Sequence, residues 1–281
     1  KCGSLLEARK VFNKLPVQNL VSWNTMISGY IEHEHHVEAF NCLEEMQSNG
    51  IQLDATTYIY FLKACGSLEL MQKGQIKHIE VVKQGLDGEP FVSNCLVDMY
   101  AKCGHFREAQ ELFGHTKGHD VVLWSTLLAA YVDHGYAEEA LKCLDQMQEE
   151  GVSKNAVTYI CILKACCVIG AIEMGRLMHS EIVKIGVKDK DNLSNCTKMI
   201  KPLIPRLDAK TALENALIDM YSKCRTLHDA WQVFNNMLSR DIVSWNAILS
   251  GFSIHELHEE MIGFFFNMKS DGTDPDQITF V

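Results

Sequence analysis

The stretch Val21–Tyr30 reads VSWNTMISGY, and close variants return twice, as VLWSTLLAAY at Val122–Tyr131 and as VSWNAILSGF at Val243–Phe252. The tryptophans of the three copies stand 101 and then 121 residues apart. A second string, which begins KCG at Lys1 and ends VF at Phe12, recurs with the same two offsets. Self-similarity at fixed offsets is the signature of a repeat architecture. The chain is therefore expected to be an array of structural repeats.

Three kinds of unit alternate in a fixed order along the chain. Boundaries at equivalent positions give units of 35, 35 and 31 residues, a triplet that accounts for the offset of 101. The offset of 121 equals the same triplet plus an insertion of 20 residues, 191–210, which we interpret as a degenerate half-unit. The complete units are 20–54, 55–89, 90–120, 121–155, 156–190, 211–241 and 242–276.

Apolar residues inside the units recur with helical spacing. Trp23, Met26, Ile27 and Tyr30 fall at i, i+3, i+4 and i+7, the pattern of one face of an α-helix. Each unit is thus predicted to form two antiparallel helices. The second helix of the first complete unit is expected at about 37–47.

Glycine and proline positions agree with this pattern of helices. Gly50 follows the expected end of a helix, where a left-handed cap is favourable. The prolines fall at unit junctions or in the insertion, where they interrupt no helix body. Because one helical hairpin cannot bury its own apolar face, neighbouring units must stack, and the repeated aromatic residues become core. The predicted fold is an all-α solenoid of helical hairpins.

Composition excludes several other classes of protein. The 281 residues are 47% hydrophobic and 22% charged, which is typical of a globular chain. No apolar run approaches the ~18 residues of a membrane-spanning helix, so no membrane association is expected. The 11 cysteines lie in apolar strings, where reduced thiols pack as small hydrophobic groups. The formal net charge of −10 is unusual for a nucleic-acid binder, although a solenoid can keep its acidic side chains away from the binding groove.

Two histidine clusters resemble metal-binding sequence motifs but lack the spacing that those motifs require. His33–His36 reads HEHH and His255–His258 reads HELH, whereas a zincin pair needs histidines at i and i+4 on one helix. Both clusters fall where a helix-to-helix turn is expected. A zinc deaminase needs PCxxC after its HxE triplet, and that string is absent from the sequence. We expect no metal, no cofactor and no catalytic residue in this chain.

The alternating unit lengths, together with the strings SWN, LKAC and DMYAKC, closely resemble plant pentatricopeptide-repeat proteins of the P-L-S subclass. Units at 20, 121 and 242 are similar to P-type units, those at 55 and 156 to L-type, and those at 90 and 211 to S-type. Residues 1–190, which open with half an S-type unit, and 211–281, which close with the start of an L-type unit, are then two stretches of one array. The resemblance implies a right-handed superhelical α-solenoid, similar to tetratricopeptide arrays.

The resemblance also implies binding of single-stranded RNA, with one base read per repeat. The expected readers are the fifth and last residues of the P- and S-type units: Asn24 with Asp54, Asn94 with Asp120, Ser125 with Asn155, Asn215 with Asp241, and Asn246 with Asp276. In the family's code, Asn with Asp favours uridine and Ser with Asn favours adenine. The L-type units carry Ile59 and Ile160 at the fifth position and discriminate weakly. The implied register is 5'-U-n-U-A-n-U-U-3'.

Second residues of the units, including Val21, Val122 and Val243, are expected to clamp neighbouring bases by apolar contact. Asp54, Asp120 and Asp241 also precede helices and so have an alternative role as helix caps. The resemblance implies a mitochondrial or chloroplast protein that supports RNA editing or processing, with editing-complex proteins as further partners. The chain begins and ends inside the pattern, so a targeting segment or a deaminase-like domain is expected to lie outside it. The alternative function is a helical scaffold for protein binding.

Overall fold

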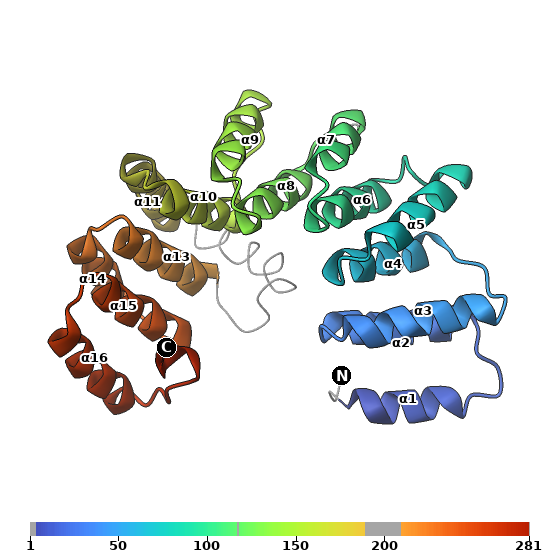
Figure 1. Cartoon of the computed structure of the whole chain (residues 1–281), viewed down its shortest axis with the longest axis horizontal. Coiled ribbons are helices and arrows are strands. Elements are labelled where there is room, and N and C mark those ends of the chain that lie inside the picture. The colour runs from blue at the N-terminus through green and yellow to red at the C-terminus, as the bar shows by residue number, and fades with distance from the viewer. Residues whose placement is uncertain (1–3, 117, 189–208, 281) are drawn as a thin grey trace. The chain divides into compact units, whose positions relative to one another are not determined.

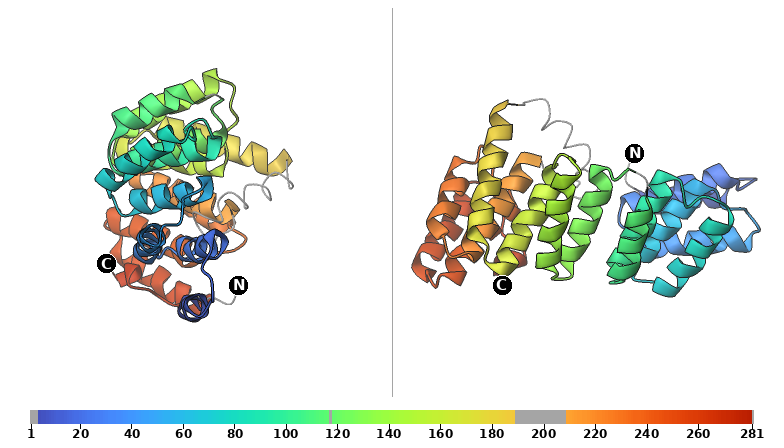
Figure 2. Two further views of the ribbon diagram at one scale, coloured as in Figure 1. Left: turned by 90° about the vertical axis from the view of Figure 1, so that its right-hand side faces the viewer. Right: turned by 90° about the horizontal axis from the view of Figure 1, so that it is seen from above.

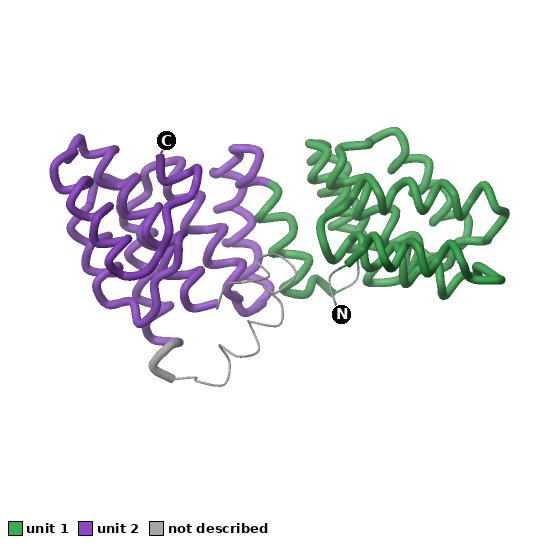
Figure 3. Tube along the Cα trace, turned by 90° about the horizontal axis from the view of Figure 1, so that it is seen from below, with its two compact units in different colours: residues 1–130 green, residues 131–281 purple. Residues whose placement is uncertain are grey.

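The computed structural model describes residues 4–116, 118–188 and 209–280, and over this part of the chain every regular element is helical, without a β-strand (Figure 1). The chain forms two compact units, Lys1–Ala130 and Tyr131–Val281 (Figure 3). The elements are α1 Leu5–Asn13, α2 Leu20–Glu32, α3 His36–Ser48, α4 Ala55–Ser67, α5 Met71–Lys83, α6 Pro90–Lys102, α7 Phe106–His115, α8 Val121–Asp133, α9 Ala137–Glu149, α10 Ala156–Ile169, α11 Ile172–Lys188, α13 Ala209–Lys223, α14 Leu227–Asn236, α15 Ile242–Ile254, α16 His258–Ser270 and a short 3-10 turn, Ile278–Phe280.

Consecutive helices pair into hairpins within each compact unit. In the first, α2 packs on α3, α4 on α5 and α6 on α7; in the second, α10 packs on α11, α13 on α14 and α15 on α16 (Figure 2). The first helices of successive hairpins also contact one another, α2 with α4 and α4 with α6, and likewise α10 with α13 and α13 with α15. The predicted all-α fold of stacked helical hairpins is confirmed.

Local sequence explains where the helices begin and end. Asn19, Asp54, Asn155 and Asp241 are N-caps whose side chains accept a hydrogen bond from the backbone N–H three residues later. Gly50 follows α3 with a φ of 74°, the left-handed conformation that its position predicted. The observed α3, His36–Ser48, exceeds the expected 37–47 by one residue at each end.

An aromatic pair is repeated at each junction between a 31-residue unit and the 35-residue unit that follows it. A phenylalanine on the second helix of the earlier unit packs in a T-shaped arrangement against a tryptophan on the first helix of the next unit. The ring centroids lie 4.6, 4.6 and 4.8 Å apart in the pairs Phe12 with Trp23, Phe113 with Trp124, and Phe234 with Trp245. The three tryptophans are buried. They are core residues, as the sequence predicted.

A second junction repeats around close glycine–methionine contacts. A Cβ on Gly74 of α5 would lie 2.5 Å from the sulfur of Met99 on α6, and a Cβ on Gly175 of α11 would lie 2.5 Å from the sulfur of Met220 on α13. With the methionines in these positions, the space beside each helix admits glycine but no larger residue. The same junction thus recurs in the two compact units.

The insertion is the least regular part of the sequence. Helix α13 begins at Ala209 rather than at the expected Thr211, so its first two residues belong to the predicted insertion 191–210. The remainder of that insertion lies outside the described residues, and our interpretation of it as a degenerate half-unit stays a prediction. Over the described residues, no helix combines the length and apolar character needed to cross a membrane.

Candidate nucleic-acid interface

Three of the predicted reader pairs are joined by a direct hydrogen bond. The Nδ2 of each asparagine donates to the Oδ1 of its aspartate at 3.3, 3.2 and 3.1 Å: Asn24 to Asp54, Asn215 to Asp241, and Asn246 to Asp276. The aspartate stands 30, 26 and 30 residues after its partner. The fifth and last residues of a unit thus form one polar site.

The stacking of first helices explains this meeting. Asn24 lies in the second turn of α2, and Asp54 is the N-cap of α4, the first helix of the next unit. Because α2 contacts α4, the start of the later helix lies beside the polar side chain of the earlier one. Asp241 occupies the same position at the start of α15, which contacts α13.

The aspartates at these sites act both as caps and as partners of the asparagines. Asp54 Oδ1 accepts from the backbone N–H of Thr57 at 2.8 Å, and Asp241 Oδ1 accepts from that of Ser244 at 2.8 Å. Asp276 likewise accepts from the N–H of Thr279 at 3.0 Å. Capping and reading are therefore compatible roles for one carboxylate.

Hydrogen bonding keeps two of these carboxylates ionised. Burial alone would raise the pKa of Asp54, but the hydroxyl and N–H of Thr57 and the amide of Asn24 donate to it, and the pKa is lowered overall. For Asp276, too, desolvation is the largest single effect and would raise the pKa, but the amide of Asn246 and the donors of Thr279 together lower it. Both groups are anions near neutral pH and can only accept hydrogen bonds.

A third side chain joins two of the pairs, and the sequence reasoning missed it. Thr57 Oγ1 lies 3.0 Å from Asn24 Oδ1 and 2.6 Å from Asp54 Oδ1. Thr279 Oγ1 lies 2.7 Å from Asn246 Oδ1 and 3.0 Å from Asp276 Oδ1. Each threonine is the third residue of the following unit. The available signal was a threonine three positions after the aspartate, which had no obvious reason to face the previous unit.

The pair Asn215 and Asp241 is more enclosed than the others. Asn215 is only 6% exposed, whereas Asn24, Asn94 and Asn246 are half-buried. Asn215 Oδ1 and Asp241 Oδ2 are buried without a hydrogen-bond partner among the described residues. Unsatisfied buried polar atoms are costly, so this site is poised to accept donors.

The remaining predicted readers lie at the equivalent positions of their units. Asn94 lies on α6, and the exposed Asp120 accepts from the N–H of Leu123 at the start of α8. The hydroxyl of Ser125 donates to the carbonyl of Val121 at 2.6 Å, and Asn155 caps α10. Ser125 belongs to the first compact unit and Asn155 to the second.

The predicted apolar clamps are available to a ligand. Val21, Val122 and Val243 are 71%, 39% and 49% exposed at the starts of α2, α8 and α15. Phe91, the equivalent second residue of α6, is 77% exposed and was not singled out from the sequence. An exposed aromatic ring at this position is well suited to stack on a base.

The histidine clusters lie around the turns between α2 and α3 and between α15 and α16, where they were expected. His33 and His255 are the C-caps of α2 and α15, and His35 precedes α3, but His36 and His258 are the first residues of α3 and α16. No group of three or more His, Cys, Asp or Glu side chains within the described residues is arranged to hold a metal ion.

Comparison with known proteins identifies the repeats. The model of the PPR repeat family matches residues 18–67 and 119–168, and the PPR repeat model matches 91–121, 215–242 and 243–273. Together these matches cover more than half of the chain. The chain belongs to the pentatricopeptide-repeat family.

Relatives of similar sequence come from Arabidopsis thaliana. Pentatricopeptide repeat-containing protein At1g11290, chloroplastic, is 32% identical over 281 residues, which are 100% of this chain and 32% of that protein. Pentatricopeptide repeat-containing protein At2g03380, mitochondrial, is 31% identical over 279 residues, which are 99% of this chain and 37% of that protein. The chain thus spans about a third of the length of these pentatricopeptide-repeat relatives.

A solved pentatricopeptide-repeat structure has a similar fold. The crystal structure of PPR10 in complex with an 18-nt psaJ RNA element matches with a TM-score of 0.65 and 17% identity. The match covers 99% of this chain and 39% of that one. At this identity the similarity concerns the fold.

Proposed function

We propose that this chain binds single-stranded RNA and reads one base with each P- or S-type unit. The observation that carries the proposal is the recurrence of a hydrogen-bonded Asn–Asp pair at the same register, at Asn24, Asn215 and Asn246. Asparagine is a mediocre helix former, so helix stability does not explain why it recurs at this position. Base recognition by the asparagine and its neighbouring carboxylate does explain it. PPR10, whose fold is similar, was crystallised with RNA.

The geometry of the pairs suits uridine. After one N–H of the Asn24 amide is given to Asp54, one N–H and one carbonyl lone pair remain. The Watson–Crick edge of uracil offers a donor, N3–H, beside an acceptor, O4. The amide can therefore make two complementary hydrogen bonds, and an anionic Asp54 can hold a bridging water.

The wider assignment follows from the unit lengths and the relatives. We assign the array to the P-L-S subclass, with the register 5'-U-n-U-A-n-U-U-3' and the ten paired readers given above. The protein acts in a mitochondrion or chloroplast, the compartments named for its relatives, in RNA editing or processing. These repeats supply recognition and not catalysis.

Fluorescence anisotropy tests the proposal. The chain is titrated into a labelled RNA that carries U-n-U-A-n-U-U and into a matched RNA in which the fixed bases are exchanged for cytidine and guanosine. Preference for the first RNA, reduced by Asn94→Ala, is the expected result. Equal affinity for both, or no binding, contradicts the proposal.

A protein-binding scaffold is the second candidate, favoured by one surface. Ile76, Ile79 and Val82 of α5 are 52%, 56% and 50% exposed and recur every three residues along one side of the helix. Such an apolar stripe is suited to another protein, including a protein of an editing complex. A chain that serves only as a protein scaffold would show no preference between the two RNAs, so the anisotropy assay separates the two candidate functions.

A further inference from the structure

The threonine that follows a reader pair contacts both of its members. Thr57 is completely buried, and its hydroxyl lies 3.0 Å from Asn24 Oδ1 and 2.6 Å from Asp54 Oδ1. Thr279 repeats the arrangement with Asn246 and Asp276, at 2.7 and 3.0 Å. Two sites far apart in the sequence thus each contain the same kind of three-residue hydrogen-bond network.

This network fixes which way round the amide points. The anionic carboxylate of Asp54 accepts only, so it draws the NH2 group of Asn24 toward itself. The hydroxyl of Thr57 carries one hydrogen, which it shares between the carboxylate and the amide carbonyl. Turning the amide by 180° would place its carbonyl oxygen against the anionic carboxylate, which is unfavourable. It would also take away the carbonyl oxygen that now accepts from the Thr57 hydroxyl, which could then act toward the amide only as an acceptor.

The direction of the amide decides between two pyrimidines. Uracil presents the donor N3–H beside the acceptor O4, whereas cytosine presents the acceptor N3 beside a donor amino group. An amide held in one direction matches uracil, and the same amide turned over matches cytosine. A group that prevents the turn therefore sets the preference between uridine and cytidine.

We propose that the hydroxyl of Thr57, and likewise that of Thr279, is a positioning group that sets the uridine-over-cytidine preference of the preceding reader pair. The proposal rests on the proposed function, since it concerns the same RNA-reading site. Thr57 does not touch the base; it acts through Asn24 and Asp54.

Other units of the same chain lack the complete network. Ser244 occupies the equivalent position after Asp241 and lies 2.8 Å from its Oδ1, but Asn215 Oδ1 is buried without a partner among the described residues. Leu123, the third residue after Asp120, has no hydroxyl. The amides of Asn215 and Asn94 are therefore held from fewer sides than those of Asn24 and Asn246.

The test compares Thr57→Val, Thr57→Ser and Thr25→Val with the unaltered chain. Valine has the shape of threonine without the hydroxyl, and serine keeps the hydroxyl. Thr25 neighbours Asn24 on α2, but its hydroxyl donates to the carbonyl of Val21 at 2.7 Å, so its replacement is the matched control. Anisotropy gives the affinity of each protein for RNAs with uridine or cytidine at the first fixed base, and for a second pair changed at the third base, which faces Asn94. Thermal unfolding confirms that each variant is folded.

The expected result is a specific loss of discrimination. Thr57→Val reduces the uridine-to-cytidine affinity ratio at the first base by about three- to tenfold, the loss of one or two hydrogen bonds. The ratio at the third base stays unchanged, Thr57→Ser restores the first ratio, and Thr25→Val leaves it intact. A Thr57→Val protein that is folded and keeps the full ratio overturns the role of Thr57 while the proposed function stands. An unaltered chain that binds both RNAs equally overturns base reading by Asn24, and the role of Thr57 with it.

Discussion

At the scale of single residues, Asp54 shows how one carboxylate combines two roles that the sequence presents as alternatives. It caps α4 through the N–H of Thr57 and holds the amide of Asn24. Asn is as good an N-cap as Asp, whereas Ala is not. Substitution can therefore separate the two roles.

We predict that Asp54→Asn leaves the free energy of unfolding nearly unchanged and that Asp54→Ala lowers it by about 1 kcal/mol, the usual cost of a lost N-cap. Both variants are expected to lose preference for uridine at the first base, because both remove the negative charge. Urea unfolding and anisotropy on the same protein samples supply the two measurements. If Asp54→Asn keeps the base preference, Asp54 is only a cap.

A second residue-scale prediction concerns pH. His179 Nδ1 lies 2.8 Å from the hydroxyl of Tyr221, and burial lowers the pKa of His179, against an opposing effect of Asp229. The folded protein thus binds this proton less readily than the unfolded chain, in which the pKa is close to 6.5. The stability contributed by the neutral ring is complete above that value and declines as the pH falls below it.

Urea unfolding at about pH 7.5 and about pH 5.5 should show this loss, because a histidine charges within that interval. His179→Phe removes the titrating group, so its stability should fall less over the same interval. His78 lies 2.9 Å from Tyr100 and also has a lowered pKa. Its contribution is present in both proteins, so the difference between the wild-type and His179→Phe proteins reports His179 alone. An equal loss in the wild-type and His179→Phe proteins would refute the assignment.

At the scale of helices and hairpins, packing between neighbours determines which substitutions are tolerated. Gly74 of α5 faces the buried sulfur of Met99, so an added methyl group at Gly74 forces that side chain to move. At Gly29 of α2 the nearest heavy atom to a new Cβ would be Leu5 Cδ2 at 3.6 Å, an ordinary contact. Both glycines lie inside helices, where alanine is intrinsically better.

We therefore predict opposite effects for one chemical change. Gly29→Ala should stabilise the protein by up to about 1 kcal/mol, the difference in helix propensity. Gly74→Ala should destabilise it, because overpacking typically costs about 1–3 kcal/mol and outweighs the same gain. Thermal unfolding of the two variants decides the matter, and stabilisation of both would show that Met99 moves away at little cost.

Sequence periodicity predicted these elements well because the packing is local. The spacing of Trp23, Met26, Ile27 and Tyr30 identified α2, and Gly50 marked the end of α3, since helix periodicity and capping depend on neighbours in the chain. The contact of Thr57 with Asn24 could not be predicted in this way. It joins residues 33 positions apart through the exact stagger of two helices, which no local pattern encodes.

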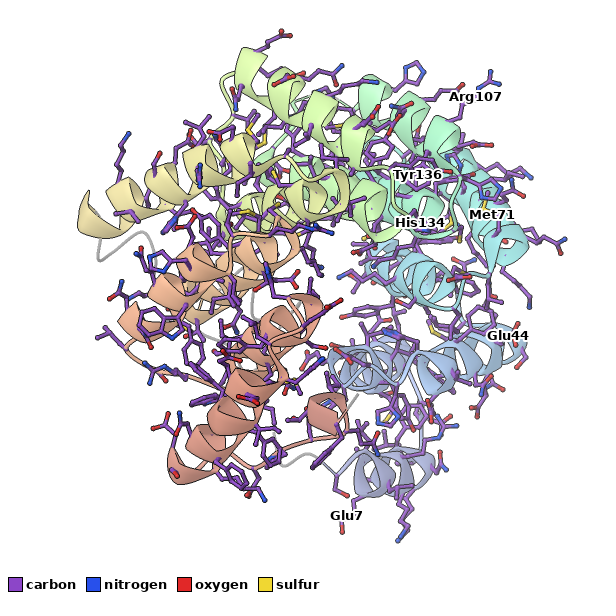
Figure 4. All side chains as sticks on the ribbon, turned by 60° about the vertical axis from the view of Figure 1, so that its left-hand side comes forward. Glu7, Glu44, Met71, Arg107, His134 and Tyr136 are labelled. Carbon is purple, nitrogen blue, oxygen red and sulfur yellow. The ribbon has the colours of Figure 1, made fainter. Side chains whose placement is uncertain are left out.

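At the scale of the whole molecule, the net charge of −10 is not shared evenly between the first and the second helices of the hairpins taken together. Exposed carboxylates such as Glu7, Glu44 and Glu149 lie on second helices, and Figure 4 shows Glu7 and Glu44 pointing outward from theirs. Exposed lysines recur on first helices: Lys63 and Lys164, and Lys102 and Lys223. The layer that carries the reader pairs is therefore less acidic than the total charge implies.

This distribution predicts how salt affects RNA binding. Each phosphate that a lysine neutralises releases counterions. In a plot of the logarithm of the binding constant against the logarithm of the salt concentration, each such contact to a single strand contributes about −0.7 to the slope. Lys63→Gln should make this slope shallower by about that amount. Lys73→Gln should not, because Lys73 lies on the second helix α5 and is paired with Glu44 of α3. The ratio of affinities for uridine and cytidine at the first base should stay constant across the titration, since hydrogen bonds to base edges release no counterions. A ratio that falls with salt would mean that phosphate contacts, and not the Asn–Asp pairs, carry the discrimination.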